Sequence, residues 1–414
     1  MPAEVKLPMS MHSGTPANPI VKVGDTVKVG QVIGEADGIV SSPVHASVSG
    51  TIKSIDTIDT FTGERAVTVT ITADGAQTPL EGIGTAKKVT TLLELLEVIK
   101  DSGAVEPGGM GYPTAYELAL KNSNTLDYLL VNGLESEPNI ASGAMAMTND
   151  TEYVWEGVKL LKMYLGPRKL IICIENNKPE AVKKMKKLSA GVRDIELRAL
   201  SPLYPQGKNN VLVYNVTGRI VPEGGRLADI GCIVINCATV AAIAKYVKTG
   251  SPLVSKCVTV GGLGVVNPKN VIVPIGTPVS ALLDYCGGLK DDAKKIILGG
   301  GPMTGAAIPG VDIPITKLTN AVLAFPEKNA NPPEAKSCIK CGRCVRVCPM
   351  RLLPPYIENA FELKKLKLLQ NLKVDMCAGC GCCAYTCPAK RPLVQVMILS
   401  KDMLNKMSDT KEAE

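Results

Sequence analysis

Two cysteine runs near the C-terminus have the same spacing. The first, CIKCGRCVRVCP, begins at Cys338, and the second, CAGCGCCAYTCP, begins at Cys377. Each reads Cys-x2-Cys-x2-Cys-x3-Cys-Pro, so three thiolates come from a tight loop and the fourth from the following turn, where the proline cannot continue a helix. A [4Fe–4S] cubane requires four thiolates around one compact centre. The sequence therefore predicts two such clusters.

The fourth cysteine of each run is predicted to ligate the cluster of the other run, as in proteins that carry two cubanes. One cluster is then held by Cys338, Cys341, Cys344 and Cys387. The other is held by Cys377, Cys380, Cys383 and Cys348. Two zinc sites built from Cys-x2-Cys pairs are the alternative, but zinc has no use for the Cys-x3-Cys-Pro repeat. Cys382 breaks the spacing and is not expected to be a ligand.

The composition indicates a reducing compartment and argues against nucleic acid as a partner. Eight of the fourteen cysteines lie in the two runs, and iron–sulfur assembly and free thiols both point to the cytosol. With two histidines in the chain, histidine-rich metal sites are excluded. The formal charge of +7 does not predict nucleic-acid binding, because each oxidised cubane with its thiolates adds about −2.

Neither export nor a membrane span is predicted. The N-terminus, MPAEVKLPMS, has no apolar signal core. The most apolar stretch, residues 230–244, is shorter than a membrane span and is better explained as a buried strand that runs into a helix. We expect a cytoplasmic protein, with peripheral association at the inner face of the cell membrane through partner subunits as the alternative.

Residues 1–75 alternate polar and apolar positions between frequent glycines. Val21, Val23 and Val27 follow a period of two, which indicates short strands. The pattern resembles the barrel-sandwich hybrid of biotinyl and lipoyl domains. The stretch that would present the modified lysine of those domains, residues 36–46, has no lysine, so we expect a docking or scaffold role.

Residues 88–248 alternate helices with apolar strands, which is typical of an α/β domain with a mostly parallel sheet. The expected strands cover 126–131, 169–175, 195–200 and 233–236, and the expected helices cover 91–100, 179–188 and 239–248. Two loops of this domain carry residues that suit a cofactor: Gly108, Gly109, Gly111 and Thr114 in one, and Asn132, Glu135 and Glu137 in the other. Glycines allow a close approach to a phosphate or a flat ring, and strand ends bind ligands. A plain turn and a solvated loop are the alternatives.

The remaining sequence divides into three segments. Residues 249–325 are rich in valine, glycine and proline and predict a small β-grasp-like module with a helix over 278–286. Residues 330–398 form the two-cluster ferredoxin domain, in which residues 355–372 are predicted to be a helical insertion with one packed leucine face. Residues 399–414 are charged, and we expect them to fray as a tail.

The order of these parts resembles the RnfC family, the peripheral subunit of Rnf electron-transport complexes. The resemblance covers nearly the whole chain and is carried by HSGTPANPIVKVGD, GGMGYPT, NGLESEP, YPQG, INCAT, GGPMTG and CGCCAYTCPAKRPLVQ. It implies a barrel-sandwich domain, a domain like the NADH-binding flavoprotein subunit of respiratory complex I, a soluble-ligand-binding β-grasp and a two-cluster ferredoxin. A related soluble branch of the family serves amino-acid reductases and includes the proline-reductase-associated electron carrier.

The sequence departs from the family pattern around the expected flavin loop. That loop usually begins Gly-x-Gly-Gly, whereas Glu106 and Pro107 precede Gly108 here, and the basic residue usual after the loop is replaced by Glu117. Both carboxylates are expected to be negative at neutral pH, so they would repel a flavin phosphate and offer it no donor. We therefore expect the chain to bind FMN and NADH poorly by itself.

These features favour an electron-transfer subunit that relays electrons through two [4Fe–4S] clusters within a larger oxidoreductase complex and receives them from a partner flavoprotein. The alternative is an FMN-dependent, NADH-oxidising subunit of an Rnf-type ion-translocating complex. A scaffold with inert clusters or zinc is disfavoured by the cysteine spacing. Nine Lys or Arg and two Glu lie in residues 336–373. Their positive field is suited to an acidic flavoprotein or ferredoxin-type partner, or it simply offsets the cluster charge.

Overall fold

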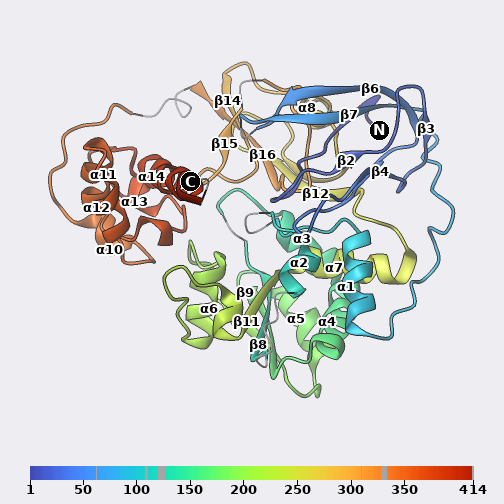
Figure 1. Cartoon of the computed structure of the whole chain (residues 1–414), viewed down its shortest axis with the longest axis horizontal. Helices are drawn as coiled ribbons and strands as arrows, with labels where there is room; N and C mark the ends of the chain where they lie inside the picture. The colour runs from blue at the N-terminus through green and yellow to red at the C-terminus, as the bar shows by residue number, and fades with distance from the viewer. Residues whose placement is uncertain are drawn as a thin grey trace.

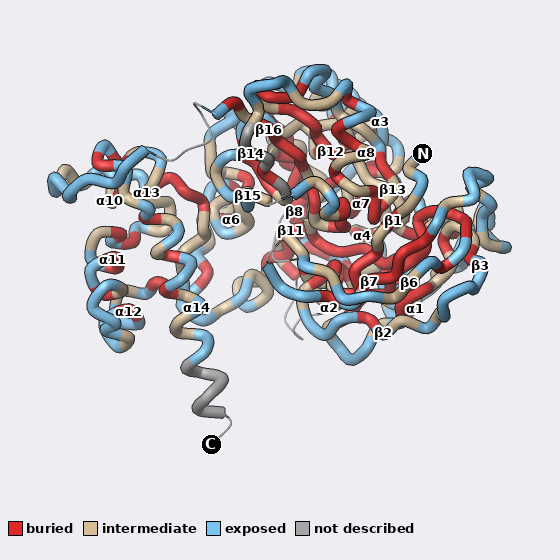
Figure 2. Tube along the Cα trace, turned by 90° about the horizontal axis from the view of Figure 1, so that it is seen from above, coloured by how far each residue is buried: buried red, intermediate tan, exposed pale blue. Residues whose placement is uncertain are grey.

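The computed structural model of the chain describes residues 1–61, 63–107, 111–119, 126–135, 137–308, 310–327 and 333–412. In Figure 1 the N-terminal strands and the strands β12 to β16 lie together above the α/β part, and the C-terminal helices stand to one side. The tube in Figure 2 shows buried segments concentrated in the two strand-rich parts.

The N-terminal part consists of two small antiparallel sheets, ordered β1-β7-β6-β3 and β2-β4-β5. Its strands are β1 (Glu4–Pro8), β2 (Asn18–Pro19), β3 (Thr26–Val27), β4 (Val32–Glu35), β5 (Val44–His45), β6 (Gly50–Asp59) and β7 (Arg65–Ala73). Val5, Leu7, Ile33 and Ile71 form their shared core, which also takes in Ile275 from the third part. The period-two pattern of the sequence therefore predicted strands correctly.

The second part has a four-stranded parallel sheet ordered β10-β9-β8-β11. The strands are β8 (Tyr128–Gly133), β9 (Lys169–Glu175), β10 (Ile195–Leu200) and β11 (Cys232–Asn236). The helices are α1 (Leu92–Asp101), α2 (Thr114–Ala119), α3 (Ser142–Asn149), α4 (Thr151–Leu165), α5 (Pro179–Ser189), α6 (Asn209–Thr217), the short 3-10 helix η1 (Leu227–Ile230) and α7 (Cys237–Thr249). The predicted parallel α/β domain is confirmed, and the predicted strands and helices lie within two residues of the observed ones at nearly every end.

Local sequence explains where these helices begin and how closely they pack. Thr91 and Glu94 form a reciprocal capping box at the start of α1. The Asn236 side chain accepts a hydrogen bond from the Ala238 N–H at the start of α7. On α4, Gly157 lets the helix touch α7, because a Cβ there would lie 2.4 Å from the carbonyl oxygen of Val240.

The third part is a five-stranded mixed sheet ordered β13-β12-β16-β14-β15 with one helix packed on it. Its elements are β12 (Ser255–Gly261), β13 (Lys269–Pro274), α8 (Val279–Tyr285), β14 (Ala293–Leu298), β15 (Ala306–Ala307) and β16 (Ala321–Pro326). The helix predicted over 278–286 is confirmed.

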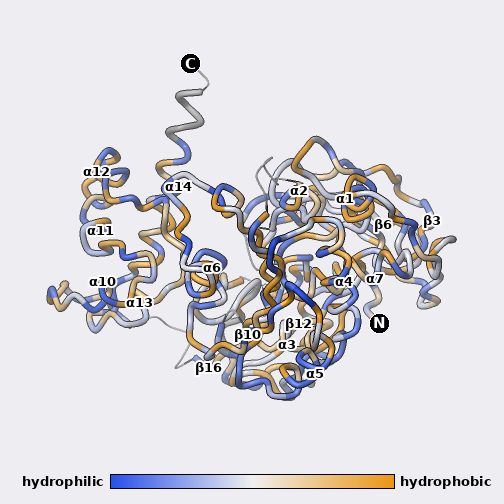
Figure 3. Tube along the Cα trace, turned by 90° about the horizontal axis from the view of Figure 1, so that it is seen from below, coloured by the Kyte–Doolittle hydropathy of each residue, from blue (hydrophilic) through white to orange (hydrophobic). Residues whose placement is uncertain are grey.

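The C-terminal part is helical. It contains α10 (Arg343–Val347), α11 (Pro354–Glu362), α12 (Leu366–Asn371), the 3-10 helix η2 (Val374–Met376), α13 (Cys382–Tyr385) and α14 (Leu393–Glu412). Figure 3 shows hydrophilic and hydrophobic segments alternating along these helices, which fits elements that bury one side.

Two predictions for this part are wrong. The insertion is not one helix with one leucine face: Lys364 has a left-handed φ of 52°, which separates α11 from α12. Leu363 is 53% exposed, whereas Leu369 is fully buried. The tail expected to fray after Met397 continues as helix α14 to Glu412. Met397 and Met403 pack this helix against the core of α11 and α12, so tertiary contact extends it.

One buried lysine joins the first three parts. Lys317, 2% exposed, donates hydrogen bonds to the carbonyl oxygens of Pro43 and Gly103, both at 2.7 Å, and to the Ser42 hydroxyl at 3.3 Å. Burial lowers its pKa to about 7. Among the described residues, no helix combines the length and the apolar character needed to cross a bilayer.

Candidate functional site

The glycine loop lies where the first three parts meet. Gly108 and Gly109 lie outside the described residues, so the structure does not test their predicted role. Gly111 has a φ of +78°, which glycine adopts at no steric cost, and its carbonyl accepts the Ser13 N–H at 2.9 Å. On the other side of the loop, the Asn320 side chain donates to the Pro107 carbonyl at 3.4 Å. Both ends of the loop are therefore held by neighbouring domains.

Glu106, just before the loop, points into the protein rather than into solvent. It is 6% exposed, and its Oε2 accepts the Asn236 N–H at 3.0 Å. Among the described residues, its Oε1 and the buried Thr114 Oγ1 have no hydrogen-bond partner. Burial, followed by the nearby charge of Glu117, raises the pKa of Glu106 to about 8.

The expectation that Glu106 and Glu117 are both negative at neutral pH is wrong. Burial also raises the pKa of Glu117 to about 7, so Glu106 is mostly protonated at neutral pH and Glu117 is about half protonated. Removing a carboxylate from water disfavours its charged form, and two neighbouring carboxylates disfavour double ionisation. The sequence showed the two acids but not their burial.

The three polar residues predicted after a strand do lie at the carboxyl end of β8, and each is engaged by the protein. The Asn132 amide donates to the Gly207 carbonyl at 2.9 Å and accepts the Leu134 N–H at 3.1 Å. Glu135 accepts the Ala144 N–H at 2.5 Å and lies 3.5 Å from Lys178 Nζ.

Glu137 is held by the GGPMTG motif of the third part. Its carboxylate accepts the main-chain N–H groups of Met303 and Thr304 at 2.8 and 3.2 Å, and also the Thr304 hydroxyl. These bonds dock the α/β part onto the third part. Glu137 is thus 7% exposed, and its acceptor oxygens are already in use.

The described residues around the loop do not fit a flavin phosphate. A phosphate needs free donors and positive charge, but the Asn236 N–H is bonded to Glu106 and two carboxyl groups stand beside it. Glycine spacing alone suits a flat ring, whereas the polar surroundings disfavour the phosphate.

Four of the cluster cysteines line one cavity, and they come from both runs. Cys348, Cys377, Cys380 and Cys383 share it with Met350 and Met397. Burial, and then the charge of Cys377, with further contributions from Cys380 and Cys348, raises the pKa of Cys383 to about 12. N–H groups of Leu352 and Gly379 point at the sulfurs of Cys348 and Cys377, both at 3.3 Å. A mainly apolar cavity with four thiols and N–H donors to sulfur fits a cubane.

The other four cysteines lie at the edge of the C-terminal part. Cys344 and Cys387 share a small apolar cluster with Leu393. Burial raises the pKa of Cys344, and the charges of Cys387 and Cys338 add to this. Cys338 is exposed and Cys341 is half-buried. The structure thus brings Cys387 to the first run and Cys348 to the second, although ligation itself stays a prediction.

The thiols are spread rather than convergent. Within the part of the chain that the structure describes, no three Cys, His, Asp or Glu side chains come close enough to hold a single metal ion. A cubane distributes its four thiolates over four iron atoms, so it does not require such convergence. Cys382 lines the same cavity as Cys380, although its position breaks the ligand spacing.

The cavity of the second run faces the α/β part. The Tyr204 hydroxyl, just before α6, donates to the Cys380 carbonyl, and Gly381 packs so closely on the Met303 carbonyl that a Cβ there would lie 2.8 Å away. Lys373 and Glu223 form an ion pair at 2.8 Å across the same junction. The motifs YPQG and GGPMTG carry the family resemblance, but the sequence alone predicted no site role for their residues.

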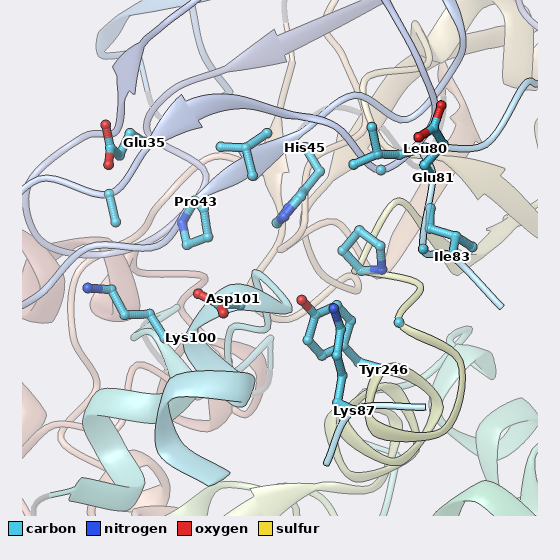
Figure 4. A pocket seen from close by; sticks show the side chains of 16 residues that line it. Glu35, Pro43, His45, Leu80, Glu81, Ile83, Lys87, Lys100, Asp101 and Tyr246 are labelled. Carbon is cyan, nitrogen blue, oxygen red and sulfur yellow. The ribbon is translucent and has the colours of Figure 1, made fainter. Parts of the chain in front are cut away.

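A separate cavity of about 460 Å³ lies between the N-terminal part and the α/β part (Figure 4). It is lined by Lys100 and Asp101 from the end of α1 and by His45 from β5. Burial, and then the charge of Lys317, lowers the pKa of His45 to about 3, so the ring is neutral. None of the residues predicted from the sequence to bind a cofactor lines this cavity.

Four family models match successive segments of the chain. Residues 1–76 match the RnfC barrel sandwich hybrid domain and residues 99–245 the Nuo51 FMN-binding domain. Residues 257–307 match the SLBB domain and residues 337–390 the 4Fe-4S dicluster domain. The predicted multidomain architecture and its two-cluster ferredoxin domain are confirmed.

The chain is also similar to named proteins, each of them the RnfC-type subunit of its complex. It is 37% identical to that subunit of the proton-translocating ferredoxin:NAD(+) oxidoreductase complex of Clostridium ljungdahlii, over 86% of this chain and 78% of that protein. The counterpart in the Na(+)-translocating ferredoxin:NAD(+) oxidoreductase complex of Acetobacterium woodii is 37% identical, over 85% and 80% respectively. The counterpart in the ion-translocating oxidoreductase complex of Rhodobacter capsulatus is 34% identical, over 99% and 80%.

One solved structure shares the fold. A chain of an NAD+-reducing [NiFe]-hydrogenase in the H2-reduced state superposes with a TM-score of 0.52 and 17% identity. The similarity covers 75% of this chain and 62% of the hydrogenase chain. At this identity it shows the fold alone.

Proposed function

Because the chain belongs to the RnfC family, we propose that it relays electrons through two [4Fe–4S] clusters within a larger oxidoreductase complex and receives them from a partner flavoprotein. One cluster is held by Cys338, Cys341, Cys344 and Cys387, and the other by Cys377, Cys380, Cys383 and Cys348. The observation that carries this proposal is the exchange of fourth cysteines between the runs: Cys348 lines the cavity of the second run, and Cys387 lies with Cys344 of the first.

The two clusters have different neighbours, and this suggests an order for the relay. The Cys377 cluster lies against the α/β part through Tyr204 and Met303. Cys338 is exposed at the far edge, next to the exposed basic residues Lys340 and Arg343. The Cys338 cluster is therefore the one that exchanges electrons with a separate, acidic redox protein.

We further propose four domains, at 1–75, 88–248, 249–325 and 330–398, followed by the segment 399–414. The protein works in the cytoplasm or at the inner face of the cell membrane, held there by partner subunits. The relatives named above, subunits of ion-translocating complexes, support the second location.

The test is anaerobic purification followed by analysis of iron, sulfide and flavin and by reduction assays. We expect about eight iron and eight sulfide per chain, little flavin, and clusters that are reduced by a reduced flavoprotein but not by NADH alone. Zinc in place of iron contradicts the relay. Stoichiometric FMN, or reduction by NADH without a partner, contradicts the partner flavoprotein but leaves the relay intact.

The second candidate is an FMN-dependent NADH-oxidising subunit. It is favoured by the match of residues 99–245 to the Nuo51 FMN-binding domain and by the raised pKa values of Glu106 and Glu117, which weaken the expected charge repulsion. Against it stands the occupied Asn236 N–H. The flavin analysis above separates the two candidates.

A further inference from the structure

The N-terminus of α7 has the features of an anion site. The helix is thirteen residues long and follows directly from β11, and the main-chain N–H of its cap residue, Asn236, points at the glycine-loop side. Exposed N–H groups and the helix dipole favour negative charge at such an end. The Asn236 side chain already satisfies the Ala238 N–H at 2.9 Å, so the Asn236 N–H is the donor available to an incoming acceptor.

That acceptor is a side chain of the protein itself. Glu106 Oε2 takes the Asn236 N–H at 3.0 Å, across 130 residues of sequence. The hydroxyl of Thr239, in the first turn of α7, lies beside the same carboxyl group, and both groups lower its pKa against the larger effect of burial. The carboxyl group therefore stands where an external anion would be bound.

The fit between this carboxyl group and its surroundings is incomplete. Glu106 Oε1 and the buried Thr114 Oγ1 have no hydrogen-bond partner among the described residues. Buried polar atoms of this kind are usually satisfied. A group with more acceptor oxygens than a carboxylate, such as a phosphate, would use the Thr114 hydroxyl as well as the Asn236 N–H.

We propose that Glu106 is an internal plug: its carboxyl group occupies an anion site formed by Asn236, Thr239 and Thr114 and thereby excludes the phosphate of a flavin mononucleotide. The inference goes beyond the electron relay, which does not depend on it. It also replaces charge repulsion with occupancy as the reason for weak flavin binding, because a protonated carboxyl group still fills the space and uses the donor.

The test compares Glu106→Gly, which removes the plug, with Glu106→Gln, which keeps its shape and its acceptor oxygen. The first probe is inorganic phosphate against chloride at equal ionic strength. We expect phosphate to raise the melting temperature of Glu106→Gly specifically and to leave the wild type and Glu106→Gln unchanged.

The second probe separates phosphate from ring. FMN and riboflavin share the ring, so Glu106→Gly should bind FMN at least about tenfold more tightly than riboflavin, whereas the wild type and Glu106→Gln should show no such preference. Fluorescence quenching of the flavin measures both affinities. A wild-type preference for FMN, or the absence of one in Glu106→Gly, overturns the plug.

Folding of the variants does not decide the outcome. If Glu106→Gly is unstable, Glu106→Ser removes the carboxyl group with a smaller backbone change and carries the same expectation. In the wild type, the amide resonance of Asn236 should not respond to phosphate, and a saturable phosphate-dependent shift of that resonance would also overturn the proposal. Iron and sulfide content reports separately on the relay and should be unchanged in every variant.

Discussion

The phenolic hydroxyl of Tyr204 donates a hydrogen bond to the main-chain carbonyl of Cys380, 176 residues away. Burial raises the pKa of Tyr204, and the nearby charge of Glu137 adds to this, so the hydroxyl keeps its proton and stays a donor. This bond ties the YPQG loop of the α/β domain to the second cysteine run, and it fixes which cluster faces that domain.

Tyr204→Phe should lower the free energy of unfolding by about 1 kcal/mol, because the Cys380 carbonyl loses its donor at a partly buried junction. Anaerobic urea unfolding, followed by the visible absorbance of the clusters, measures the change. Tyr214→Phe is the matched control, since Tyr214 lies on α6 and is 48% exposed. Equal losses in the two variants would contradict a specific role for Tyr204.

Cys387→Ala should damage the cluster of the first run, although Cys387 lies closer in sequence to the second. Iron content should fall from about eight to about four per chain, since a cubane that loses one thiolate is labile. The electron paramagnetic resonance signal that remains should match the one lost in Cys380→Ala. Cys382→Ala is the control and should retain both clusters. Damage confined to the Cys377 cluster would rule out the exchange of fourth ligands.

Reduction of the clusters by an acidic ferredoxin should slow as salt rises, because ions screen the attraction to the basic residues around Cys338. Arg343→Glu with Arg346→Glu should slow it at low salt and flatten the salt dependence. Stopped-flow reduction measures the rate. Arg65→Glu, on β7 of the N-terminal domain, is the control. A rate indifferent to ionic strength would mean that the basic residues only offset cluster charge.

Stability should fall as pH rises through neutrality because of Glu106. Its folded pKa of about 8 lies above the ordinary value of 4.5, so the folded state binds the proton more tightly. The resulting stabilisation is fully present below 4.5 and is lost by about 1.4 kcal/mol per pH unit until the pH passes 8. Urea unfolding of the wild type between pH 6 and about 8.5 should show this loss, and Glu106→Gln should show a smaller slope. Parallel slopes in the two proteins would contradict the buried, protonated Glu106.

Much of the fold could be predicted because it rests on local pattern. The apolar run Lys169–Glu175 is observed as β9 with the same ends, since a strand buried on both faces leaves a continuous apolar signature. The cysteine runs are equally local, because their ligand spacing is set by cubane geometry. The break at Lys364 had no such signal: a lysine in the left-handed region is not marked by residue type.

The polar site was harder to predict, because its chemistry depends on partners far away in sequence. Glu137 looked like a residue for a ring or a ribose, but the Thr304 turn holds it. Glu106 looked like a charged residue beside a loop, but it is buried against Asn236. Residue type and position identified both acids correctly, whereas their burial and protonation follow from contacts that one sequence does not reveal.

The bonds of Lys317 also set an order of events during synthesis. Its acceptors at Pro43 and Gly103 precede it by 274 and 214 residues, so the first two domains leave the ribosome well before the residue that joins them. Domains generally fold as they emerge, and here the joint closes only when residue 317 is available. Both cysteine runs follow Lys317 in the chain, so cluster insertion comes last, onto a body whose three-way joint is already in place.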